Sequence, residues 1–199
     1  MNPLQRQISK WQEYTKLSEV GGIARRAFAN NSFDGVLTMI GVVMGSFFVG
    51  VQDASVVLVT GLSTALAIGV SGGWGAYLTE SAERRHEISE LERFTLTNLR
   101  DTKIGKASRM AVVLVAAVDG LSPFLAALMV LVPFFFVPLL PSVTYAYYGS
   151  VAMALLALFG LGTYLGNISR ENVISYGVKT AVAGVVCIGL SFVLAQLAA

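Results

Sequence analysis

The stretch "VVLVTGLSTALAIGVSGGWGAYL", residues 56–78, contains no charged side chain. The charge-free run around it extends from residue 54 to residue 79. A helix needs about 20 mainly apolar residues to cross the hydrocarbon core of a bilayer. The run is therefore long enough to span a membrane, and it predicts a transmembrane helix over residues 55–79.

The composition of the whole chain agrees with a membrane location. The chain has 199 residues, of which 55% are hydrophobic and 13% are charged, and its mean hydropathy is +0.68. A soluble domain usually carries about 25% charged residues. The formal net charge is only +2, and the basic residues cluster beside the apolar runs. These features predict an all-α polytopic membrane protein and exclude a nucleic-acid-binding protein.

Four further spans follow from the other apolar runs. Residues 35–52 carry no charge, and residues 110–169 carry none except Asp119. The second run is long enough for two helices, and Pro138 and Pro141 break it because proline cannot continue a helical hydrogen-bond ladder. We predict five transmembrane helices, at residues 33–52, 55–79, 109–137, 142–167 and 173–197.

The lysines and arginines predict the orientation. They gather before the first span and in the connection 80–108. The positive-inside rule places both segments in the cytoplasm and the C-terminus on the opposite side. We expect residues 1–32 to form an interfacial amphipathic helix, with a frayed polar tail as the alternative. Residues 33–199 would form the membrane domain, with 80–108 as its cytoplasmic helical extension.

Asp34 is the first candidate metal ligand, because it stands at the cytoplasmic start of the first span. Thr38, Gly41 and Gly45 fall on its side of the helix at about 100° per residue. An ionisable group in a span usually faces the bundle interior or a water-filled path. The alternative is that Asp34 caps the start of the helix.

Asp119 is the second candidate, about nine residues into the third span. Pro123 follows four residues later and has no N–H to donate to the carbonyl of Asp119. Carboxylate and carbonyl oxygens together can form an ion site in a broken membrane helix. The alternative is a proline kink whose acid pairs with a donor such as Lys179.

Acidic residues and the only histidine follow the second span. These residues are Glu80, Glu83, His86, Glu87 and Glu90. Glu83 and His86 have the i, i+3 spacing found in carboxylate metal bundles, and such ligands suit iron or manganese. The alternative is a solvated, salt-bridged face, since arginines are interleaved. Within the span, Thr64 and Ser71 share a face and are candidates to line a path.

The chain resembles the vacuolar iron transporter family in its Asn-rich lead into "FDG" and in "GLSTALAIGVSGGWGAYLTESAE", residues 61–83. The resemblance implies a dimeric exchanger that moves Fe²⁺, and often Mn²⁺, out of the cytoplasm against protons. It also implies that Asp34 lines the path. The family's glutamate and methionine in the second span fall on Thr64 and Gly72, which offer neither a carboxylate nor a sulfur.

The sequence therefore predicts a proton-coupled transporter of divalent metal ions, with Asp34 and Asp119 as ligands and the acidic stripe as a collecting site. The alternative is a membrane metal sensor or scaffold that does not transport. No enzyme is expected, because no nucleophile–base arrangement accompanies His86. The expected partners are metal ions, the lipid bilayer and a second copy of the chain, with no tightly bound cofactor.

Overall fold

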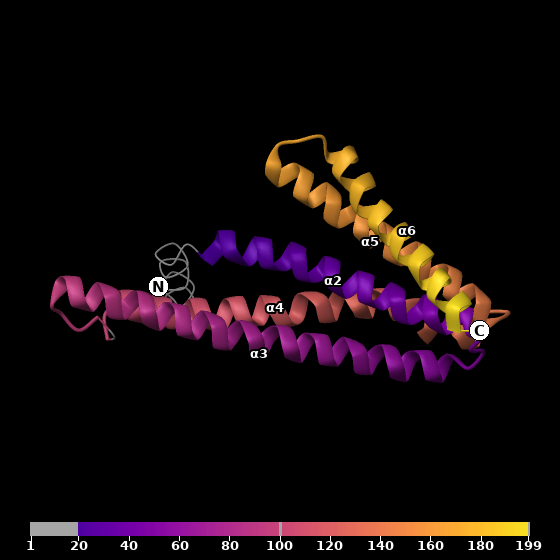
Figure 1. The fold of residues 1–199 in the computed structure, drawn as a ribbon, viewed down its shortest axis with the longest axis horizontal. Helices are drawn as coiled ribbons and strands as arrows, with labels where there is room; N and C mark the ends of the chain where they lie inside the picture. Colours follow the sequence, from indigo (N-terminus) through magenta and orange to yellow (C-terminus); the bar gives the residue numbers. More distant parts are fainter. Residues whose placement is uncertain (1–19, 100, 199) are drawn as a thin grey trace, which may run out of the picture. The chain divides into compact units, whose positions relative to one another are not determined.

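The computed structural model describes residues 20–99 and 101–198, and these residues are almost entirely helical (Figure 1). The elements are α2 (Val20–Phe48), α3 (Ala54–Thr95), α4 (Lys103–Phe135), the short 3-10 helix η1 (Val137–Leu139), α5 (Val143–Ser169) and α6 (Val173–Ala198). Five helices of the described chain are long and apolar enough to cross a membrane. The predicted all-α polytopic fold with five spans is confirmed.

The helices extend beyond the predicted spans on the side that carries the basic residues. α2 begins at Val20, and α4 begins at Lys103, whereas hydropathy placed their starts at 33 and 109. Hydropathy marks where lipid surrounds the chain, but the i→i−4 hydrogen bonds of a helix continue as long as the backbone permits.

The connection 80–108 is only partly an extension of the second span. α3 continues without a break to Thr95, and α4 begins at Lys103. The turn between them includes Leu96, which has a positive φ of 50°. Of the predicted interfacial helix, residues 1–19 lie outside the described residues, and residues 20–32 belong to α2.

The turn between α2 and α3 has recognisable end signals for both helices. Gly50 takes a positive φ of 81°, and the N–H of Val51 donates to the carbonyl of Ser46 (3.0 Å). This pattern closes a helix C-terminus because glycine adopts the left-handed conformation without strain. Asp53 then accepts the N–H of Ser55 at its Oδ1 (2.8 Å), and it thereby caps α3.

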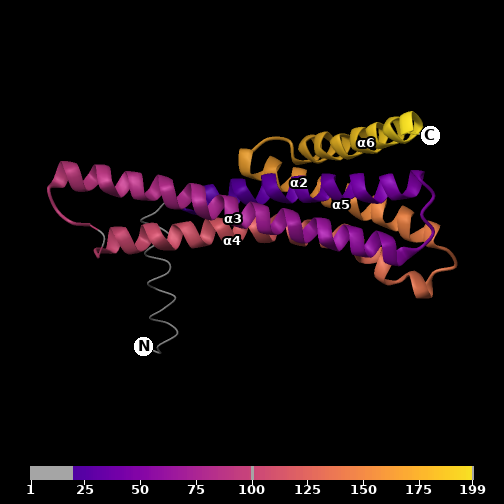
Figure 2. The same ribbon diagram turned by 60° about the horizontal axis from the view of Figure 1, so that its bottom comes forward.

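The chain divides into two compact units. Unit 1 comprises the chain up to Phe28 with Val70–Leu121, and unit 2 comprises Ala29–Gly69 with the chain from Ser122 onward. In unit 1, the second part of α3 lies beside the first part of α4 (Figure 2). Ala111 and Val115 of α4 form a small buried cluster there, with Ile23 and Ala24 packed against it.

Unit 2 contains the larger apolar core. It takes buried side chains from α2, α3, α4 and α5, among them Met39, Val57, Leu131, Phe134 and Leu158. α6 lies along α5 (Figure 1), and glycines allow the two helices to approach closely. A Cβ on Gly166 would stand 2.9 Å from the Cα of Val173, and one on Gly177 would stand 2.7 Å from the Phe159 ring. Small residues at helix contacts are the usual way for membrane helices to pack.

Candidate functional site

Asp34 lies inside α2 rather than at its beginning. α2 starts at Val20, so Asp34 comes about four helical turns later. The first orphan N–H groups of a helix belong to its first turn, and Asp34 therefore cannot cap α2. The structure excludes the capping alternative and leaves an acid in the middle of a membrane helix, with an exposed side chain in the single chain.

The glycine next to Asp34 holds that stretch of α2 against α4. A Cβ on Gly35 would overlap the carbonyl oxygen of Pro123 and would stand 2.7 Å from the Pro123 Cα. Only glycine permits this approach of two backbones. Because successive residues are about 100° apart around a helix, the contact at Gly35 also fixes the direction of Asp34, which points away from Pro123.

The face of α2 that carries Asp34 is open in the single chain. Thr38 is exposed, and no heavy atom of the described chain outside α2's own neighbouring backbone lies within 4 Å of a Cβ placed on Gly41 or Gly45. Asp34, Thr38, Gly41 and Gly45 thus form a strip with one carboxylate, one hydroxyl and no bulky side chain. We call this strip the Asp34 face.

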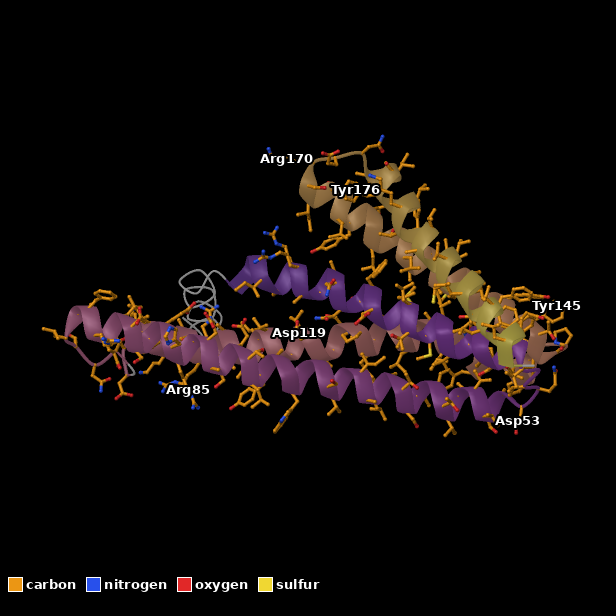
Figure 3. All side chains as sticks on the ribbon, viewed as in Figure 1. Asp53, Arg85, Asp119, Tyr145, Arg170 and Tyr176 are labelled. Atoms are coloured by element: carbon orange, nitrogen blue, oxygen red, sulfur yellow. The ribbon has the colours of Figure 1, made fainter. Side chains whose placement is uncertain are left out.

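Asp119 lies in unit 1, where α4 passes α3. A Cβ on Gly72 would stand 2.6 Å from the carbonyl oxygen of Asp119, and one on Gly73 would stand 3.3 Å from that of Ala116. The Asp119 carbonyl, which Pro123 leaves without its helical N–H donor, is thus directed at the backbone of α3. The side chain of Asp119 is half-buried on α4 (Figure 3).

Gly72 stands at the position where the family resemblance implies a methionine, and a longer side chain has no space there. The space that this side chain would need already holds the backbone of Asp119 and Gly120. Thr64 differs because its side chain is half-exposed and its hydroxyl donates to the carbonyl of Thr60 (2.8 Å). Ser71 is exposed on the same helix.

The acidic stripe on the extension of α3 is partly neutralised by arginine. Arg84 lies 3.4 Å from a carboxylate oxygen of Glu80 and 3.4 Å from one of Glu87. Arg93 lies 3.9 Å from Glu90, while Glu83 and His86 are exposed. Within the described residues of one chain, no three His, Cys, Asp or Glu side chains are grouped to hold a metal ion.

The structural role of two glycines was missed by the sequence analysis. In each Asp-Gly pair, Asp34-Gly35 and Asp119-Gly120, the glycine is buried at a contact between helices. The signal was present, since both pairs begin similar octapeptides, "DGVLTMIG" and "DGLSPFLA". Lys179, the alternative partner proposed for Asp119, has its Nζ 5.1 Å from the ring centroid of Tyr176 near the start of α6.

Comparison with known proteins places the chain in a family. The sequence profile of the VIT family matches residues 26–115, a region that includes Asp34 and the acidic stripe and ends before Asp119. The chain is also 32% identical over 173 residues to an uncharacterized protein of Methanocaldococcus jannaschii, with 85% of this chain and 87% of that protein covered. Members of this family are transporters rather than enzymes. The five spanning helices and these two matches show that the chain belongs to the VIT family of membrane metal-ion transporters.

Proposed function

We propose that the protein exports Fe²⁺ or Mn²⁺ from the cytoplasm in exchange for protons. The observation that carries the proposal is the position of Asp34, in the middle of a membrane helix, on an open face that has no other charge. A carboxylate in a span is costly unless it serves a path or a partner. Carboxylate oxygens are suitable ligands for both ions.

Proton coupling follows from the same carboxylate. A metal ion and a proton compete for its oxygens, so that binding of the metal releases the proton. Asp34 and Asp119 each act as metal ligands in this proposal, and Thr38, Thr64 and Ser71 line the path. The stripe Glu80–Glu90 collects the ion on the cytoplasmic side, with the N-terminus on that side and the C-terminus on the other.

We further propose that the protein works as a homodimer. The Asp34 face is uncovered in the single chain, and a strip of small residues is what membrane helices use to approach one another. A dimer would also contain two copies of the exposed candidate ligands Glu83 and His86. Two acidic stripes could then bind the metal ion together. Each E-x-x-H pair would then have the second copy that a carboxylate metal site uses.

The second candidate function is a metal sensor or scaffold that does not transport. One specific observation favours it: Gly72, at the position of the family's methionine, lies so close to Asp119 that a longer side chain has no space. A chain built in this way lacks the sulfur ligand, and Thr64 supplies no carboxylate in place of the family's glutamate.

The test is metal flux into proteoliposomes under an imposed pH gradient, measured separately for Fe²⁺ and Mn²⁺. The variants are Asp34→Asn and Asp119→Asn. Asp53→Asn is the matched control, because Asp53 is exposed in the turn before α3 and asparagine caps a helix as well as aspartate does. Flux that follows the gradient, persists in Asp53→Asn and disappears in both other variants supports the exchanger.

Two results would contradict parts of the proposal. Flux that survives Asp119→Asn would restrict the ligand role to Asp34. An absence of flux from folded, inserted parent protein, combined with saturable metal binding that Asp34→Asn abolishes, would favour the sensor.

A further inference from the structure

A cavity of about 570 Å³ lies in unit 1, between the extension of α3 and the first turns of α4. None of its lining residues is proposed to bind metal, and the inference drawn from it does not rest on the proposed function. Its lining consists of Tyr77, Ser81, Arg84, Arg85, Ile88, Ser89 and Glu92 from α3 and Gly105, Ser108, Arg109, Val112 and Val113 from α4. The volume is in the range of pockets that hold small ligands.

The charge of the lining selects an anion. Three arginines face one glutamate, and an arginine stays protonated at all relevant pH values. Glu92 accepts the N–H of Leu99 (2.8 Å), and Arg84 contacts Glu80 and Glu87. Arg85, which is exposed, forms no ion pair with any other described residue. The guanidinium groups of Arg85 and Arg109 are suitable donors for a phosphate.

Hydroxyl groups add further donors to the same space. Ser81, Ser89 and Ser108 all line the cavity, and across the described ranges their hydroxyls are not engaged in hydrogen bonds. A phosphate has three or four oxygens to satisfy, and arginine with serine is a common donor set for it. The cavity thus offers both charge and hydrogen bonds to one compact anion.

The position of the cavity along the helices adds a third property. The last charge-free residue of α3's apolar run is Thr79, and the charge-free run of α4 begins at Met110. The lining extends across both limits, from arginines to Val112 and Val113. Tyr77 lines the cavity, and its ring centroid lies 6.1 Å from that of Trp74; such aromatic residues are common where a helix passes through a membrane interface. The cavity therefore extends from the charged segment of unit 1 into its apolar segment.

We propose that this cavity binds a phosphate monoester or diester group, with Arg85 and Arg109 as its main charged contacts. The phosphate belongs either to the headgroup of an acidic phospholipid, whose chains run along Val112 and Val113, or to a soluble phosphate compound. Both sources share the same recognition chemistry. The site lies on the side of the membrane that carries the basic segments.

The test uses this 199-residue chain with Trp11→Phe, which leaves Trp74 as its one remaining tryptophan. The protein is placed in bilayers of phosphatidylcholine that contain brominated phosphatidic acid or, for comparison, brominated phosphatidylcholine. Bromine quenches a nearby tryptophan, and the ratio of quenching gives the relative affinity for the anionic lipid. A parallel calorimetric titration adds inorganic phosphate and pyrophosphate to protein in pure phosphatidylcholine discs.

Three variants define the site. Arg85→Gln removes one charge, and Ser108→Leu fills the cavity while every charge remains. Arg93→Gln is the matched control, because Arg93 is on the same extension, is 82% exposed and does not line the cavity. We expect phosphatidic acid to be enriched at Trp74, and we expect Arg85→Gln and Ser108→Leu each to reduce this enrichment roughly tenfold, the usual effect of one charge-assisted contact. Arg93→Gln should leave it unchanged.

The two sources of phosphate give different results. Enrichment of phosphatidic acid without calorimetric binding identifies a lipid site. Calorimetric binding that Arg85→Gln and Ser108→Leu weaken and Arg93→Gln leaves unchanged identifies a soluble ligand. The proposal is overturned if neither probe binds to folded parent protein. It is also overturned if Arg93→Gln reduces binding as much as Arg85→Gln, because the attraction would then be a general property of the basic surface.

Discussion

Asp34-Gly35 on α2 and Asp119-Gly120 on α4 are the same dipeptide in two different settings. In unit 2, Gly35 meets the backbone of Pro123, and Asp34 points away onto an open face. In unit 1, Gly120 lies beside Gly73, and the carbonyl of Asp119 is directed at Gly72. The glycine has the same task in both pairs, namely close helix contact, whereas only Asp34 is left on an uncovered face. Helix packing therefore decides what each acid is able to do.

The largest expected effect is on transport. Asp34→Asn should lower metal flux by at least about a hundredfold, since loss even of an outer-shell partner often costs ten- to a hundredfold in metal affinity. Initial rates of flux, measured beside Asp119→Asn and Asp53→Asn, check this. If Asp34→Asn transports at the parent rate, the Asp34 face is not the path.

The next effect concerns the contact that orients Asp34. Gly35→Ala places a Cβ on the backbone of Pro123, which cannot move aside like a flexible side chain. We expect the free energy of unfolding to fall by about 3 kcal/mol, as in overpacked cores. Thermal unfolding in detergent measures it, with Gly41→Ala as the control at an open position. Equal stability of the two variants would contradict the close contact at Gly35.

A somewhat smaller effect is expected at the corresponding contact of unit 1. Gly72→Ala places a Cβ 2.6 Å from the Asp119 carbonyl oxygen and should destabilise by about 2 kcal/mol. The control is Gly75→Ala, since a Cβ added to Gly75 would lie in open space. Thermal unfolding again provides the measurement. A gain in stability for Gly72→Ala would show that α3 and α4 separate easily.

Removing the hydroxyl of Tyr147 should lower the free energy of unfolding by about 1 kcal/mol. Its hydroxyl donates to the carbonyl of Val51 (2.9 Å), so Tyr147→Phe loses one hydrogen bond between α5 and the turn after α2. Tyr148→Phe is the control, because Tyr148 is 62% exposed. Chemical unfolding of both variants distinguishes them, and an equal effect would mean that the hydrogen bond contributes nothing measurable.

The smallest expected effect is the pH dependence of the helix cap formed by Asp53, an aspartate that lies outside the spans, unlike Asp34 and Asp119. The hydrogen bonds from the side chain and N–H of Ser55 lower the pKa of Asp53 below its ordinary value of 3.8. A carboxyl whose pKa is lower in the folded state stabilises above its unfolded pKa, and this contribution disappears as the pH falls through the folded pKa. Amide exchange at Ser55 should therefore lose protection only below about pH 4, whereas Asp53→Asn should show no such step.

The spans were predictable because lipid imposes a simple constraint, a minimum length without charge. Residues 54–79 and 180–199 carry no charge, and the spans that contain them needed no other information. The helix starts at Val20 and Lys103 were missed because polar residues continue a helix as readily as apolar ones do. The break predicted at Pro138 and Pro141 is confirmed, since α4 ends at Phe135 and α5 begins at Val143. Proline alone does not decide where a helix ends, because α4 continues through Pro123 and Pro133.

The candidate site was predictable in its residue types and not in its geometry. Asp34 stood out because an acid in an apolar run is rare. The sequence could not show which glycine meets a backbone, because Gly35, Gly41 and Gly45 have identical local signals and differ only in what lies opposite. Nor could it show that Arg84 would lie between Glu80 and Glu87, or that Arg85 would face a cavity.

The contact between Gly72 and Asp119 has a consequence for how relatives of this chain can diverge. A relative with a long side chain at position 72 must displace the backbone around position 119 or move α4 away from α3. Substitutions at these two places are therefore coupled: a methionine introduced at 72 alone meets a steric barrier, and it becomes tolerable only after α4 has changed. Across many related sequences, the size of the residue at 72 should vary together with the identity of residues 116–120, even though neither position depends on the other for its chemistry.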